Sequence, residues 1–159
     1  MAFAVGDRIA HPMHGAGIID SIETTMQDGV ERKYYVVHIS VGDILVKIPT
    51  DSLEAIGVRP IIRPEEADKI LKSIESIEIS MTSNWNKRYR ENMMRIKSGN
   101  LMEVAAVVKG LAARDCDRGL STGERKMLHS AKQILISELV LSKSASYDEV
   151  SAKLEHALM

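Results

Sequence analysis

Cysteine is almost absent from this sequence, because Cys116 is the only one in 159 residues. A single cysteine cannot form an internal disulfide, so nothing indicates an oxidising compartment. No apolar run approaches the roughly 18 residues that span a bilayer, and the start MAFAVGDRIAHP lacks the charged and apolar regions of a signal peptide. We therefore expect a cytoplasmic protein without a membrane segment.

Aromatic residues and net charge are also low: aromatics make up 4%, and 21 Lys+Arg stand against 22 Asp+Glu, a net charge of −1. A protein that coats nucleic acid over its whole surface needs many Lys or Arg contacts to phosphate, so that class is excluded. A local basic patch is not excluded. The 45% hydrophobic and 27% charged content is that of an ordinary soluble globular protein.

Catalytic motifs are missing as well. The sequence contains no phosphate-binding G-x-x-x-x-G-K-[ST], no G-x-S-x-G and no dinucleotide fingerprint, so we expect neither an enzyme nor a cofactor or small-molecule substrate. His11 and His14 have the H-x-x-H spacing of metal ligands, but they stand in a Pro/Gly turn without nearby cysteines or clustered carboxylates. That setting favours turn or hydrogen-bonding roles over a metal site. Cys116 could be a reactive thiol, but the sequence shows no base that would activate it, so we interpret it as a small packing residue.

The first 64 residues are rich in Val, Ile and Tyr, broken by Gly, Pro and Asp at short intervals. This pattern predicts about five short antiparallel strands, which must curl into a small SH3-like or Tudor-like β-barrel to bury a core. Asp28-Gly29 predicts a tight hairpin turn, because both residues tolerate positive φ. Alternation predicts that Tyr35, Val37 and Ile39 share one face, while Asp20 interrupts its strand and indicates a bulge or a strand end.

From Pro64 the apolar spacing becomes helical, so residues 65–159 are expected to form a compact bundle of about five helices. Asn84 offers an N-cap, and three polar residues are each followed by a glutamate three positions later: Asn100, Ser121 and Ser146. Met93, Met94 and Met127 are interpreted as core filling. The fold class is therefore α+β, with a sheet domain at 1–64 and a helical domain at 65–159.

One predicted helix, NWNKRYRENMMRIK at 84–97, departs from the rest of the chain. It holds five basic residues and one acid, and the only tryptophan, Trp85, stands at its start. Basic side chains here can hold DNA phosphates while the flat indole acts as a wedge at an unstacked step. The competing interpretation is that Trp85 packs between the domains and the basic residues form a solvated face.

The sequence resembles the CarD/CdnL family of bacterial transcription regulators that bind RNA polymerase. The resemblance covers essentially the whole chain and rests on these segments, in order: VGD (5–7), HPMHG (11–15), YYVV (34–37), IP (48–49), NWNKRYREN (84–92), SG (98–99), RGLSTGE (118–124) and AKQIL (131–135). It implies that residues 1–64 are a Tudor-like RNA-polymerase-interacting domain that docks on the β subunit. It further implies that residues 65–159 contact promoter DNA at the upstream edge of the −10 element and stabilise the open complex.

The resemblance also implies site residues. Trp85 matches the family's wedge tryptophan; Lys87, Arg88 and Arg90 fall on or beside its phosphate-contacting positions, and Arg125 is a further candidate. The DNA would be read in the minor groove without sequence specificity. For polymerase docking, Lys47 occupies a matching basic position, and strand-edge pairing is expected around Thr25 and Met26. Where many relatives carry an arginine, this chain has Thr24-Thr25, so one ion pair with polymerase is in question.

Two other functions stay open from the residues. The first is a protein-interaction adaptor whose β-barrel binds a partner, with Trp85 as interdomain packing and no direct DNA role. The second is a metal-dependent enzyme at His11 and His14.

Overall fold

Turn residues divide the first sixty residues into five strands and one short helix. The computed structural model describes residues 2–159. Its strands are β1 (Arg8–His11), β2 (Gly15–Gln27), β3 (Val30–Ile39), β4 (Ile44–Pro49) and β5 (Arg59–Pro60), with the helix α1 (Leu53–Ile56) before β5. They form one antiparallel sheet in the order β4-β3-β2-β1-β5. The predicted number of strands is confirmed.

The sheet does not close into the predicted barrel, because within residues 2–159 its edge strands β4 and β5 are not paired with each other. β5 has only two residues, so it offers few backbone groups for pairing with a further strand. Leu53 of α1 and Val58 instead join the buried cluster of the sheet, so the open side is filled by side chains.

The hairpin and the bulge are confirmed. Asp28 and Gly29 connect β2 to β3 with φ angles of 51° and 77°, as a two-residue turn requires. The register between β2 and β3 shifts between Ile19 and Ser21, which leaves Asp20 as the extra residue. The face of β3 carrying Tyr35, Val37 and Ile39 is buried, as the alternation predicts.

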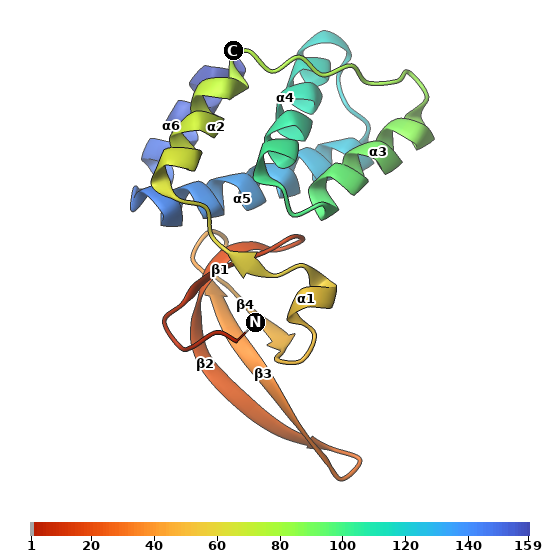
Figure 1. Cartoon of the computed structure of the whole chain (residues 1–159). Helices are drawn as coiled ribbons and strands as arrows, with labels where there is room; N and C mark the ends of the chain where they lie inside the picture. Colours follow the sequence, from red (N-terminus) through yellow and green to blue (C-terminus); the bar gives the residue numbers. More distant parts are fainter. Residues whose placement is uncertain (1) are drawn as a thin grey trace.

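The β2–β3 hairpin extends beyond the rest of the sheet. β1 pairs only with residues 15–18 of β2, and β4 pairs only with residues 34–39 of β3. Residues 24–33, here called the hairpin arm, therefore form a two-stranded ribbon without neighbouring strands among the described residues. The arm points away from the helices (Figure 1).

Five helices follow, in the predicted number: α2 (Pro64–Ile74), α3 (Trp85–Lys97), α4 (Leu101–Arg118), α5 (Thr122–Lys143) and α6 (Tyr147–Leu158). Each predicted cap satisfies a backbone N–H that would otherwise lack a partner. The side chain of Asn84 accepts from Lys87 N–H, and that of Asn100 accepts from Met102 N–H. Ser121 and Ser146 accept from the N–H of the glutamate three residues later.

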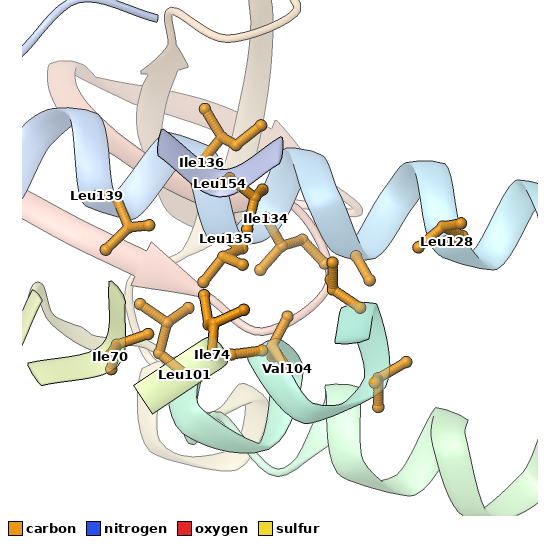
Figure 2. Close-up of a cluster of buried hydrophobic side chains, with 14 of the residues drawn as sticks. Ile70, Ile74, Leu101, Val104, Leu128, Ile134, Leu135, Ile136, Leu139 and Leu154 are labelled. Carbon is orange, nitrogen blue, oxygen red and sulfur yellow. The ribbon is translucent and has the colours of Figure 1, made fainter. Parts of the chain in front are cut away.

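The core of the helical part forms around α5. Leu128, Ala131, Leu135 and Leu139 lie along its buried side. Figure 2 shows α5 side chains facing those of α2, α4 and α6. Two packing predictions are wrong: Met94 is 72% exposed, because it lies on the outer face of α3, and Cys116 is exposed in the last turn of α4.

The sheet and the helical part meet where α5 crosses the end of the sheet (Figure 1). Arg59 of β5 donates two hydrogen bonds to the Glu138 carboxylate, at 2.6 and 2.9 Å, and a third to the Gly99 carbonyl. The buried Ser137 hydroxyl accepts from Ala16 N–H. These contacts connect the two parts directly. No helix within residues 2–159 is long and apolar enough to cross a membrane.

Candidate nucleic-acid interface

The start of α3 places Trp85 at an outer end of the molecule. The Asn84 side chain accepts from Lys87 N–H at 3.0 Å, which begins the helix at Trp85. The chain enters α3 at the end remote from the sheet (Figure 1). Trp85 therefore belongs to the surface of the helical part and not to the contact between the two parts.

The indole of Trp85 is held on three sides but stays 42% exposed. Its ring stacks on Tyr89, one turn later in α3, with ring centroids 5.1 Å apart and planes 20° apart. Its Nε1–H donates to Ser121 Oγ at 2.9 Å, at the N-cap of α5. Gly123 lies against the ring, since a Cβ built there would be in ordinary van der Waals contact with Trp85 at 3.5 Å.

Arg88 does not have the position predicted for a phosphate-contacting residue. Its side chain is 3% exposed and forms a bidentate ion pair with Glu124, whose side chain is 2% exposed. Nε and Nη2 donate to the carboxylate at 2.7 and 3.0 Å, and Nη1 donates to the carbonyls of Thr82 and Ser83. All three guanidinium nitrogens are occupied inside the protein, so Arg88 is unavailable to a phosphate.

The pair also shifts both ionisation equilibria. Hydrogen bonding to Arg88 is the largest cause that lowers the pKa of Glu124, against the opposing effect of burial. The same hydrogen bonds raise the pKa of Arg88 above its ordinary value. The two groups are therefore both charged at neutral pH, and neither adds net charge to the surface.

The other predicted cations are free to meet an anion. Lys87, Arg90 and Arg125 are exposed, and within the described part of the chain no ion pair includes them. At 100° per residue, Lys87 and Arg90 lie about 200° and 140° around α3 from Trp85, so they are on the opposite side of the helix from the indole. Arg125 belongs to the first turns of α5, the segment whose Ser121 and Gly123 touch the indole.

Sequence reasoning missed three residues of this site: Tyr89, Ser121 and Glu124. The four-residue spacing of Trp85 and Tyr89 could have indicated stacking on one helix face. Ser121 and Glu124 were identified only as a helix cap, and nothing in the sequence says that this cap lies against α3. That information comes from tertiary packing alone.

The predicted docking residues lie in and beside the hairpin arm. Lys47 of β4 is exposed, and its Nζ lies 2.8 Å from Glu23 Oε2, a contact that raises the pKa of Lys47. Strand pairing places Lys47 on the same face as Ser21, and therefore as Thr25, while Met26 lies on the opposite face. Met26 is 67% exposed.

The two candidate metal ligands, His11 and His14, lie side by side with ring centroids 4.5 Å apart. Among residues 2–159, no group of three or more His, Cys, Asp or Glu could hold a metal ion. Burial, with a smaller contribution from His14, lowers the pKa of His11 to about 4. His11 is therefore neutral at pH 7, and its Nδ1 accepts from Met13 N–H.

The arrangement as a whole defines a class: a five-stranded antiparallel sheet joined to a five-helix bundle that presents an exposed tryptophan and several exposed cations without ion pairs among residues 2–159. Two family models match the chain, one over the sheet and one over the helical part. Residues 3–62 match the family model described as the CarD-like/TRCF RID domain, and residues 69–155 match the model described as the C-terminal domain of CarD. The chain therefore belongs to the CarD family, in agreement with the resemblance read from its motifs.

A full-length relative supports this assignment. The chain is 33% identical over 150 residues to the Bacillus subtilis (strain 168) protein named "Putative transcription factor YdeB", an alignment that covers 94% of this chain and 98% of the relative. The chain is also similar to the solution NMR structure of the 72-residue N-terminal domain of Myxococcus xanthus CarD. That match has 27% identity and a TM-score of 0.33, over 37% of this chain and 79% of that one. Family membership indicates a transcription-factor role linked to RNA polymerase.

Proposed function

We propose that the protein docks on the RNA polymerase β subunit through residues 1–64 and stabilises the open promoter complex through residues 65–159. The observation that carries the DNA half is the Trp85 indole, which remains 42% exposed although its polar Nε1–H already has a partner. The exposed part of the ring is therefore apolar. An apolar side chain inserted at a base step, with cations on nearby phosphates, is a known way to hold a distorted minor groove.

The cations assigned to phosphate are Lys87, Arg90 and Arg125. All three are exposed without an ion pair among the described residues, so binding a phosphate breaks no existing pair. Arg88 is left out of this set, because it is buried against Glu124. The site has few donors suited to base edges, which favours recognition of DNA shape over sequence.

The hairpin arm supports the docking half. Its outer backbone edges have no strand beside them in the described structure, and such edges accept an added strand from a partner. Thr25 and Met26 belong to this edge, and Lys47, which is paired with Glu23, lies on one face beside it. The family resemblance implies an arginine at the place of Thr24-Thr25, so we expect docking here to depend more on backbone pairing.

The mechanism follows from linkage. A protein that binds the melted promoter better than the closed one shifts the equilibrium by the difference in the two binding free energies. Unstacking a base step costs about a few kcal/mol, and ~1.4 kcal/mol already changes a population ratio tenfold. Docking on polymerase raises the local concentration of the wedge at the promoter. This explains how a chain of net charge −1 acts on DNA.

The test is the lifetime of the open complex formed by purified polymerase holoenzyme on one promoter, with saturating wild-type protein or Trp85→Ala. We expect wild type to prolong the lifetime and Trp85→Ala to bind polymerase equally well without prolonging it. If Trp85→Ala prolongs the lifetime as much as wild type does, the wedge role of Trp85 is contradicted. The adaptor function with Trp85 between the domains is not favoured by any observation, because the contacts of Trp85 lie within the helical part.

A further inference from the structure

The N-cap of α5 does more than begin a helix, because it also holds the indole of Trp85. Ser121 Oγ accepts from two donors: Glu124 N–H at 3.2 Å and Trp85 Nε1–H at 2.9 Å. The Ser121 hydroxyl in turn donates to Glu124 Oε1 at 3.3 Å. One serine hydroxyl therefore connects the tryptophan to the buried acid.

The chain of hydrogen bonds continues from Glu124 into α3. Arg88 binds both oxygens of the Glu124 carboxylate and also the carbonyls of Thr82 and Ser83, in the segment just before Trp85. The route Trp85–Ser121–Glu124–Arg88 thus starts and ends at the beginning of α3. It ties this end of α3 to the first turn of α5 on both sides of the indole.

We propose that Ser121, Glu124 and Arg88 are positioning residues that set the orientation of the Trp85 ring before DNA is bound. Tyr89 supports one face of the ring, and Ser121 fixes its rotation about the side-chain axis. A side chain already held in its bound orientation loses less conformational entropy on binding, so more of the contact energy appears as affinity. This inference rests on the proposed wedge role of Trp85, and it assigns to Arg88 a role in orientation.

The chain offers a matched pair of caps to test the inference. Ser121 and Ser146 both accept from the N–H of a glutamate three residues on, and both hydroxyls lie 3.3 Å from that glutamate's Oε1. Only Ser121 has an indole bound to it. Because glycine is nearly as good an N-cap as serine, Ser121→Gly removes the indole acceptor at little cost to the helix, and Ser146→Gly is its control.

The first readout is the indole N–H signal in a ¹H–¹⁵N spectrum of the free protein, which is unambiguous because Trp85 is the only tryptophan. We expect Ser121→Gly to shift this signal and speed its exchange with water, and Ser146→Gly to leave it unchanged. Ser121→Thr keeps the hydroxyl, so its indole signal should match that of wild type. An unchanged indole signal in Ser121→Gly overturns the inference, whatever happens to the proposed function.

The second readout is the open-complex lifetime with polymerase holoenzyme. We expect Ser121→Gly to shorten it roughly two- to fivefold, the size of one exposed hydrogen bond, and Ser146→Gly to have no effect. In the Trp85→Ala background, Ser121→Gly should cause no further change. Equal lifetimes for the two glycine variants, or an effect that persists in the Trp85→Ala background, contradict positioning. If Trp85→Ala alone changes nothing, the proposed wedge fails instead, while the indole signal still reports on the hydrogen bonds.

Discussion

At the scale of single residues, the structure separates arginines that the sequence makes look alike. Arg88 and Arg90 are two positions apart in one basic segment, yet Arg88 is buried against Glu124 and Arg90 is exposed. Removing one partner of a buried ion pair leaves the other charge without compensation, whereas removing an exposed cation leaves no such penalty. The two residues should therefore fail in different ways when substituted.

We expect Arg88→Ala to destabilise the fold by about 3–5 kcal/mol, because the Glu124 carboxylate would stay buried without its guanidinium. In a chain of this size that corresponds to a fall in Tm on the order of 10 °C. Arg90→Ala, the matched control, should change Tm little and instead weaken DNA binding. Thermal melting of the two purified variants checks this, and equal melting temperatures would mean that the buried pair contributes nothing.

His11 should make stability depend on pH. Its pKa is lowered to about 4 in the folded protein and is about 6.5 in an unfolded chain, so the unfolded state binds more protons between these values. Stability is therefore complete above about pH 6.5 and falls as the pH drops towards 4. Protonation would also remove the Nδ1 acceptor that binds Met13 N–H.

The measurement is the free energy of unfolding by urea at several pH values between 4 and 7, for wild type and His11→Gln. The variant should show a smaller loss of stability across this window, since it has no group at position 11 that titrates there. Identical pH profiles would show that the pKa of His11 is not lowered in the folded protein. The pKa of Glu124 is also lowered, from an ordinary value of about 4.5, so its contribution to stability is lost only as the pH falls below that value. This loss should appear at the acid end of both profiles alike.

At the scale of elements, the hairpin arm and the caps were predictable because their chemistry is local. Asp28-Gly29 specifies a turn with positive φ, and the polar caps at Asn100, Ser121 and Ser146 specify helix starts. The open sheet was not predictable from local pattern, since closure depends on whether β4 and β5 meet. Met94 was wrongly predicted to fill the core for a related reason. The periodicity of a sequence shows which residues share a helix face, but tertiary packing decides which face is buried.

The turn of the hairpin arm gives a test at this scale. Gly29→Ala places a side chain at φ 77°, which costs roughly 1–2 kcal/mol, while nothing lies near the added Cβ. Because the arm has no neighbouring strands within residues 2–159, we expect a local loosening: faster amide hydrogen exchange in residues 24–33 and weaker polymerase binding, with little change in Tm. Asp28→Gly, which suits its turn position, is the control. Unaltered polymerase binding in Gly29→Ala would argue against the arm as the docking element.

At the scale of the whole molecule, the contact between the sheet and the helical part sets where the wedge lies relative to the docking arm. Glu138, 1% exposed, binds both Arg59 and the N–H of Ile62. Ser142 adds a hydrogen bond to the Ile62 carbonyl. These contacts hold the chain just before α2, where the sheet ends and the bundle begins. The sequence held no sign of this pairing, because Arg59 and Glu138 are distant along the chain.

We expect Arg59→Met to destabilise the protein by about 3 kcal/mol, since it leaves the buried Glu138 carboxylate without its cation. Polymerase binding through the arm should persist, while the open-complex lifetime should fall because the wedge loses its fixed position. Arg63→Met, at an exposed residue just outside this contact, is the control. Melting and lifetime measurements on both variants check the prediction, and a full lifetime with Arg59→Met would show that rigid connection is not needed.

The central claim is that docking and the wedge are separate functions of one chain, and the most direct measurement is open-complex lifetime as a function of protein concentration. Lys47→Glu should shift the curve to higher concentration and reach the wild-type plateau, with Lys72→Glu on α2 as a control that matches wild type. With Trp85→Ala, the lifetime at saturating protein should stay below the wild-type plateau, however much protein is added. A Trp85→Ala curve that reaches the wild-type plateau would contradict the account.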